Sequence, residues 1–209
     1  KGLPAGAGCE AFLCNVKGRL LGYVFVFADE ESLWIESVSG QGGALTSHLN
    51  KYCLVEDVHL VDQTETLAEF LVSGPQAAQL LTEAGLNVSE LEPWQHVKLA
   101  AQTAGVESGF HIKRVDIFGA SAFLITGSAA QGDALWEKLT SVGIAPAGTS
   151  VFDSLRIEAA FPVYGIDLSD ENLAQEASRT EEAISFQKGC YLGQEPIARL
   201  NAMGHVNKA

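Results

Sequence analysis

The chain has 209 residues, of which 47% are hydrophobic and 19% are charged, a balance typical of a folded protein and not of a disordered one. Its formal net charge is −13, and the sequence contains no cluster of Lys or Arg. A broad surface for binding nucleic acid is therefore excluded, whereas a small anionic ligand in a local pocket is still allowed. The longest apolar runs are far too short to cross a bilayer, so we expect neither a membrane nor a nucleic acid as a direct partner.

Residues 1–65 predict a small α+β domain. We expect strands at 10–16, 19–28, 32–38 and 56–62. The first two flank Lys17-Gly18, a turn signal that indicates a hairpin. Residues 42–54 place apolar side chains three to four positions apart, which is typical of one face of a helix. Together these elements fit a helix that covers one face of an antiparallel sheet.

Residues 66–209 predict a second α+β domain. We expect strands at 67–74, 96–101, 111–119 and 121–127. We expect helices at 74–85, 128–143 and 149–160, the last with Ser150 as its N-cap. This order resembles half of a ferredoxin-like layer. Residues 161–209 have little hydrophobic period and indicate a long ordered loop system, where functional residues often gather.

The four cysteines show neither a CxxC motif nor the spacing of a metal finger, so we expect no metal ligands among them. They are Cys9, Cys14, Cys53 and Cys190. Three of them lie in apolar stretches, where a free thiol behaves as a small hydrophobic group. This usage indicates reduced thiols and a cytoplasmic location, or the mitochondrial matrix in a eukaryote.

Cys190 is different, because polar residues and glycines surround it. Lys188 offers a cation that lowers the pKa of a neighbouring thiol, and such a thiol is the more reactive one. The adjoining residues offer backbone freedom, an aromatic ring, an amide and a carboxylate: Gly189, Tyr191, Gly193, Gln194 and Glu195. A cysteine between glycines is nevertheless more often buried and inert than reactive, so residue chemistry alone leaves both interpretations open.

A second group of candidates lies in the stretch LRIEAAFPVYGIDL. Arg156 and Glu158 are two positions apart on the predicted helix and therefore face different ways. One can bind outward while the other forms a structural ion pair. A carboxylate suits a heterocycle with adjacent N–H donors, because it accepts two hydrogen bonds at once. Two solvated helix residues are the alternative, and Asp167 has the alternative role of a loop cap.

These residues carry a family resemblance. KGCYLGQE at 188–195 matches every specified position of the K-G-C-Y-x-G-Q-E signature of the YgfZ-type folate-binding proteins, which act in iron–sulfur cluster assembly or repair. SLRIEAAFPVYGIDL resembles the R-x-E-A-G-x-P-x-Y-G-x-D stretch of the related aminomethyltransferase, the T-protein of glycine cleavage, with Ala160 in place of the usual glycine. NVKGRLLGYVFVF resembles a further segment shared by both groups.

The resemblance implies an aminomethyltransferase-like folate-binding fold with ferredoxin-like antiparallel sheet layers and discontinuous domains around a channel. It also implies that this chain lacks the N-terminal segment and the C-terminal β-barrel of family members. Tetrahydrofolate is the implied cofactor, and iron–sulfur client enzymes or assembly proteins, including tRNA-modifying enzymes, are the implied partners. Cys190 and Lys188 become the reactive residues, with Gly189, Tyr191, Gly193, Gln194 and Glu195 as their loop. Glu158 becomes the acceptor for the pterin, with Arg156 and Tyr164 as further pocket residues.

One difference separates the two related groups. After KGRLL the aminomethyltransferases carry an acidic pair for their one-carbon chemistry, whereas this sequence has Gly22 and Tyr23. Neither residue is a carboxylate base at neutral pH, so the difference favours the YgfZ-type group. Two alternatives stay open: a folate-dependent aminomethyltransferase or methyltransferase, and a purely structural interaction module.

Overall fold

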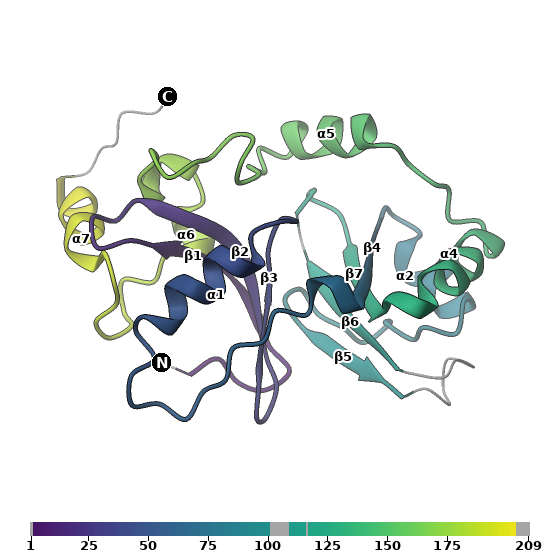
Figure 1. The fold of residues 1–209 in the computed structure, drawn as a ribbon. Coiled ribbons are helices and arrows are strands. Elements are labelled where there is room, and N and C mark those ends of the chain that lie inside the picture. Colours follow the sequence, from purple (N-terminus) through teal and green to yellow (C-terminus); the bar gives the residue numbers. More distant parts are fainter. Residues whose placement is uncertain (1, 101–108, 116, 204–209) are drawn as a thin grey trace. The chain divides into compact units, whose positions relative to one another are not determined.

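The computed structural model describes residues 2–100, 109–115 and 117–203 (Figure 1). The chain divides into two compact units, each described separately below. Unit 1 joins Lys1–Asp62 to Pro162–Ala209, and unit 2 is Gln63–Phe161. The sequence predicted two consecutive domains, 1–65 and 66–209. The compact units differ from that division because the last part of the chain packs with the first.

Unit 1 is built on a three-stranded antiparallel sheet in the order β1-β2-β3. Its strands are β1 (Gly8–Cys14), β2 (Leu20–Ala28) and β3 (Leu33–Glu36). The predicted hairpin and third strand are confirmed. The Asn15 side chain closes the hairpin turn, since its Oδ1 accepts hydrogen bonds from the backbone N–H groups of Lys17 and Arg19 at 2.8 and 3.2 Å.

Helix α1 (Gly42–Asn50) packs on one face of this sheet through its buried Leu45. A Cβ atom added at Gly22 would lie 2.9 Å from Cδ2 of Leu45, so the helix comes against β2 at a position where only glycine fits unchanged. The helix ends four residues before the predicted residue 54. The strand predicted for 56–62 is wrong: the segment is irregular, and Val58 and Val61 are exposed. An alternating pattern makes a strand only where a neighbouring strand completes its hydrogen bonds, and none of the described strands pairs with it.

The tail of the chain explains why unit 1 is discontinuous. It contains η3 (Ala174–Ala177), α6 (Thr180–Ala183) and α7 (Gln194–Met203), where the sequence predicted only an ordered loop. A small core joins the tail to the hairpin: Cys14, Leu20, Leu168, Ala174, Ala177 and Ile197. The backbone N–H of Leu20 also donates to the carbonyl of Asn172 at 3.0 Å. Burial of this apolar surface, and not sequence proximity, decides where the tail belongs.

Unit 2 is a four-stranded antiparallel sheet in the order β4-β7-β6-β5. Its strands are β4 (Leu67–Ser73), β5 (His96–Leu99), β6 (Phe110–Val115) and β7 (Ala122–Ser128). Its helices are η1 (Thr64–Thr66), α2 (Ala77–Glu83), η2 (Ala129–Gln131), α4 (Gly132–Ser141) and α5 (Thr149–Glu158). These elements confirm the predicted ones, although 128–143 forms two helices instead of one. Ala101 and Asp116, which belong to predicted strands, lie outside the described residues.

Alternation along the strands gives the sheet of unit 2 two different faces. One face is apolar and meets α2 and α4 in the main core, with Phe110, Ile112, Phe123 and Ile125 at its centre. The other face carries buried polar side chains among apolar ones, and Lys113 and Thr126 are the examples at its centre. There Lys113 Nζ donates to Oγ1 of Thr126 at 2.6 Å, and the Thr126 hydroxyl donates to Glu69 at 2.7 Å. Hydrogen bonds of this kind offset the cost of burying a charge.

The predicted α+β class is therefore confirmed, with antiparallel sheets in both units. Within the described part of the chain, none of the helices has the length and apolar character needed to span a membrane.

Candidate functional site

Cys190 lies on an exposed loop of unit 1. Residues 185–190 are all exposed, whereas Ile184 before them and Tyr191 after them pack against the small core around Cys14. The loop is therefore fixed at both ends and open to solvent between them. Cys14 and Cys190 are both free thiols, but Cys190 is exposed whereas Cys14 is buried. The structure thus leaves the Cys190 thiol accessible, and its reactivity stays a prediction.

Lys188 lies over the ring of Tyr191, with its Nζ atom 4.3 Å from the ring centroid. This cation–π contact closes the exposed loop back onto its own anchor. Burial raises the pKa of the Cys14 thiol to about 11, and the Lys188 ammonium opposes that rise. Burial likewise raises the pKa of Cys9, again opposed by Lys188. The structure thus gives Lys188 an electrostatic role at the thiols of β1, while its action on Cys190 stays a prediction.

The two glycines of the 188–195 motif have different roles. Gly193 has φ +78°, and a Cβ atom there would lie 2.6 Å from the carbonyl oxygen of Asn15 and 3.0 Å from Cα of Gly18. The motif therefore packs backbone against backbone on the β1–β2 hairpin turn, which only glycine permits. A Cβ atom on Gly189 would meet nothing within 4 Å. Gly193 is required by packing, and Gly189 is not.

Gln194 and Glu195 open helix α7. The backbone N–H of Gln194 donates to the carbonyl of Tyr191 at 3.2 Å, and Glu195 is an exposed acidic residue in the first turn. A carboxylate near a helix N-terminus is favourable because of the helix dipole. Glu195 thus has a structural explanation, the Gln194 contact involves its backbone alone, and contact with a ligand stays a prediction for each.

Arg156 and Glu158 lie in helix α5 of unit 2 and differ in burial. Arg156 is buried, and its Nε lies 2.7 Å from Oδ1 of Asp153. Glu158 is exposed. The two side chains therefore face different ways, as their spacing predicts. The helix begins after Gly148, which corrects the predicted N-cap at Ser150. Gly148 has an extended backbone that ends the preceding loop, so the helix starts earlier.

Helix α5 ends in a left-handed residue. Ala160 has φ +50°, and the N–H of Phe161 donates to the carbonyl of Arg156 at 2.8 Å across the end of the helix. This hydrogen bond is the mark of a Schellman cap, whose left-handed position usually holds glycine. This backbone geometry explains why the related sequences usually have glycine where this chain has Ala160.

Tyr164 belongs to unit 1, where it packs against the same small core as Tyr191. Burial raises the pKa of its phenol, and Asp170 adds to that rise. Asp167 accepts a hydrogen bond from the N–H of Val163 at 2.8 Å, the loop-cap role that the sequence left open. The structure thus brings Tyr164 and the Cys190 loop onto one core. Arg156 and Glu158 belong to the other unit.

A buried ionic cluster in unit 1 was missed by the sequence analysis. It consists of Glu10 on β1, Tyr23 on β2 and Arg179 in the tail. Glu10 and Tyr23 are 4% and 6% exposed, so their polar groups depend on each other and on Arg179. The signal that could have revealed it is a carboxylate inside the apolar strand sequence CEAFLC, because a buried charge requires a partner.

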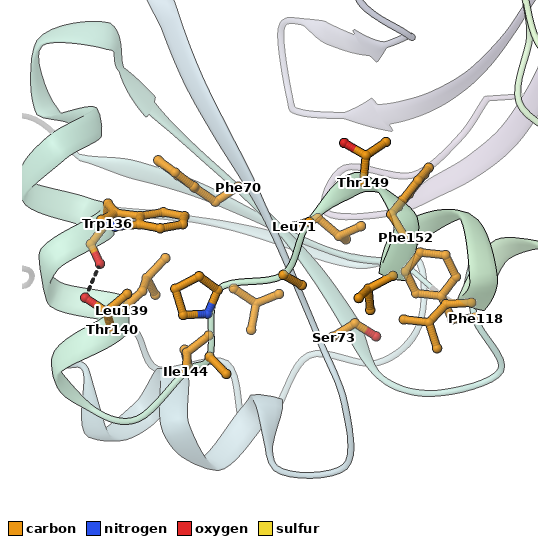
Figure 2. Close-up of a pocket in the computed structure, with 17 residues that line it drawn as sticks. Phe70, Leu71, Ser73, Phe118, Trp136, Leu139, Thr140, Ile144, Thr149 and Phe152 are labelled. Atoms are coloured by element: carbon orange, nitrogen blue, oxygen red, sulfur yellow. Dashed lines mark hydrogen bonds between the residues drawn. The ribbon is translucent and has the colours of Figure 1, made fainter.

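Unit 2 also contains an apolar cavity of about 490 Å³ (Figure 2). Strand β4, helix α4, the 144–148 connection and the start of α5 line it. Figure 2 shows Phe70 and Trp136 toward one end and Phe118 and Phe152 toward the other. The polar side-chain groups of its lining are the hydroxyls of Ser73, Thr140 and Thr149 and the indole N–H of Trp136, and none of the predicted site residues is among the lining residues. The cavity is therefore distinct from the predicted site.

Nothing in the described ranges groups three or more His, Cys, Asp or Glu side chains in a way that could hold a metal ion. The candidate residues therefore fall into two sets. Unit 2 contributes the exposed carboxylate of Glu158 on α5, and unit 1 contributes the exposed Cys190 thiol with Tyr164 and Tyr191 beside the small core.

The fold is that of the aminomethyltransferases. The glycine cleavage system aminomethyltransferase T of Bartonella henselae superposes with a TM-score of 0.82 over 97% of this chain and 55% of that protein, at 23% sequence identity. The predicted fold is thereby confirmed. A family model for the GCVT N-terminal domain matches residues 2–188, and the chain belongs to this family.

Curated relatives agree with this assignment. An aminomethyltransferase of Symbiobacterium thermophilum is 27% identical over 99% of this chain and 57% of its own length. One of Exiguobacterium sibiricum is 33% identical over 90% of this chain and 51% of its own length. The chain thus spans about half the length of the curated relatives it matches. The resemblance to the T-protein-related family is confirmed at this level.

Proposed function

We propose that the chain is part of a tetrahydrofolate-binding protein that supports the assembly or repair of iron–sulfur clusters through Cys190. The observation that carries this proposal is the environment of positions 22 and 23. Gly22 lies beneath Leu45, and Tyr23 is bonded into a buried cluster with Glu10. At the place where the related transferases carry their acidic pair, neither residue of this chain offers a carboxylate base, which argues against the transferase chemistry.

Tyr23 does not replace the missing base. Burial raises the pKa of its phenol far above the ordinary value, and the neighbouring Glu10 adds to this rise. The phenol therefore stays protonated and donates its hydrogen bond to Glu10. A neutral donor enclosed in this way does not abstract a proton from a substrate at neutral pH.

The exposed residues fit the proposed ligand and thiol roles. The exposed carboxylate of Glu158 suits a pterin, whose adjacent N–H groups would both donate to it. Tyr164 offers a partly exposed ring for apolar contact. Tetrahydrofolate would supply one-carbon or redox chemistry when bound. Cys190 presents a thiol that can bind iron transiently. One cysteine cannot hold a cluster that needs about four ligands, so the cluster is a cargo shared with a partner.

A second candidate function is aminomethyl transfer to tetrahydrofolate. The names of the relatives favour it, since the proteins from Symbiobacterium and Exiguobacterium are both aminomethyltransferases. It needs a proton acceptor other than positions 22 and 23. Both candidates use a reduced folate, so folate binding alone does not separate them, whereas catalytic turnover does.

The test combines Cys190→Ser with a matched Cys53→Ser control, introduced into the gene of the host organism. We expect Cys190→Ser to lower the activity of iron–sulfur enzymes and the level of the tRNA modifications that such enzymes make, and Cys53→Ser to leave both unchanged. Purified protein should show no aminomethyl transfer. Normal iron–sulfur enzyme activity in the Cys190→Ser strain, or clear turnover in the transfer assay, would overturn the proposal.

Folate binding is measured on the same proteins by calorimetry with tetrahydrofolate. Glu158→Gln should weaken binding by about 10- to 100-fold, the loss expected for a charged hydrogen bond. Glu137→Gln is the control in the same unit, since it neutralises an exposed carboxylate on α4 that has no predicted role in the site. Equal binding by the Glu158→Gln variant would remove the pterin role from Glu158.

A further inference from the structure

The Glu10–Tyr23–Arg179 cluster connects the sheet of unit 1 to the segment that leads to Cys190. Arg179 reaches Glu10 with two nitrogen atoms: Nε lies 3.0 Å from Oε2, and Nη2 donates to Oε1. Its Nε also lies 3.2 Å from the hydroxyl oxygen of Tyr23. A two-pronged contact of this kind fixes direction as well as distance, which a lysine in the same place does not do.

Arg179 lies just before helix α6, which leads into the exposed loop 185–190. The Nη1 atom of Arg179 lies 3.5 Å from Glu182 within that helix. Helix α6 contacts β1, and Ile184 directly follows its last residue. The exposed residues 185–190 begin at this point. The ion pair with Glu10 therefore holds the upstream end of the Cys190 loop, as Tyr191 holds its downstream end.

We propose that Arg179 is a positioning residue for Cys190. Its ion pair with Glu10 fixes α6 on β1 and so limits where the loop can place the thiol. The apolar anchors Ile184 and Tyr191 resist separation from the core but allow sliding, because apolar contact is not directional. The directional restraint comes from the ion pair. The inference rests on the proposed function only in taking Cys190 as the working residue.

Burial makes the cluster sensitive to the loss of one member. Glu10 is 4% exposed, so its carboxylate has little access to water once Arg179 is removed. An unpaired buried charge destabilises the folded state, so we expect the segment that covers Glu10 to open and expose the carboxylate to water. The segment after Arg179 is the part free to move, since β1 and β2 are held by their own hydrogen bonds.

A spin label on Cys190 tests this proposal. The background carries Cys9→Ala, Cys14→Ala and Cys53→Ala, so that Cys190 is the single labelled site. Its electron paramagnetic resonance spectrum should contain an immobilised component. Arg179→Gln should abolish that component, and Arg179→Lys should restore part of it, because lysine keeps the charge but not the two-pronged geometry. A second background with Cys53 as the single cysteine provides the control label in unit 1.

A double variant, Glu10→Gln with Arg179→Gln, distinguishes two roles of Arg179: positioning the loop and neutralising the charge of Glu10. If Arg179 acts only by neutralising Glu10, the double variant should regain the immobilised component at Cys190. If Arg179 positions the loop, the double variant should stay mobile, and this is the result we expect. Regained immobility, an unchanged Cys190 spectrum in Arg179→Gln, or equal loosening at Cys53 would each overturn the proposal. The spectra need neither folate nor clusters, so a failure of the proposed function would leave this test intact.

Discussion

The two motif segments of the chain are held in place by different means. The end of α5 is fixed locally, by the Arg156–Asp153 pair one turn apart and by the hydrogen bond that caps the helix. The 188–195 motif is fixed by residues far away in the sequence, through the contact of Gly193 with the hairpin turn and of Tyr191 with the small core. Each segment nevertheless leaves predicted site residues exposed: Glu158 in the first, and Lys188, Cys190 and Glu195 in the second.

The comparison shows that a motif combines two kinds of position. Some positions, such as Gly193, hold the backbone in place, and others, such as Cys190, present an exposed side chain. The comparison also predicts how far a substitution in each segment affects stability. Changes in the 188–195 frame should weaken the whole of unit 1, whereas changes at the end of α5 should have small and local effects, because only local contacts depend on them.

The largest effect should come from Gly193→Ala. An added Cβ atom would lie 2.6 Å from the Asn15 carbonyl in a left-handed conformation, and we expect a loss of about 2–4 kcal/mol in the free energy of unfolding. Denaturation in urea measures this loss. Gly189→Ala is the control in the same motif and should change stability by less than about 0.5 kcal/mol. Equal effects of the two changes would contradict the distinction between the packed and exposed glycines.

The next effect concerns the buried thiol beneath the loop. Burial raises the pKa of Cys14 from 9.0 to about 11 in the folded chain. The unfolded chain therefore loses this proton first as pH rises, so stability is complete below pH 9 and falls through pH 11. We expect a fall of about 2–3 kcal/mol. Cys14→Ala should remove this part of the fall, while the part due to Tyr23 above pH 10 should persist.

The control for that experiment is Cys53→Ala, which should keep the slope of the natural chain. Denaturation at each pH between 8 and 11 provides the measurement. A Cys14→Ala variant with an unchanged slope would show that the thiol is not sealed by the small core.

The smallest effect is expected at the locally held segment. Ala160→Gly should raise the free energy of unfolding by about 0.5–1 kcal/mol, because relief of left-handed strain exceeds the entropy that glycine adds to the unfolded chain. Thermal denaturation measures the gain. Ala159→Gly is the neighbouring control: its φ is −82°, so glycine should destabilise there. A loss of stability in both variants would mean that position 160 carries little strain.

Local patterns predicted most elements correctly because the hairpin turn at Lys17-Gly18 and the helix periodicities are short-range signals. The strand at 56–62 failed because pairing depends on a distant neighbour. Helix α7 was missed because its start depends on the contact of Gly193 with the hairpin, which no local pattern reveals.

The candidate site shows the same limit. The motif predicted a functional Cys190, which stays a prediction. Spacing predicted that Arg156 and Glu158 diverge, as their burial confirms. Arg179 could not be recognised, because its partner Glu10 lies 169 positions away in the sequence. The membership of the tail in unit 1 is equally long-range.

The contact between Gly22 and Leu45 also couples these two positions. A Cβ atom at position 22 would lie 2.9 Å from Cδ2 of Leu45, the end of a flexible side chain, so a larger residue there requires Leu45 to take another rotamer. Among related chains, we therefore expect the size of residue 22 to vary together with that of residue 45.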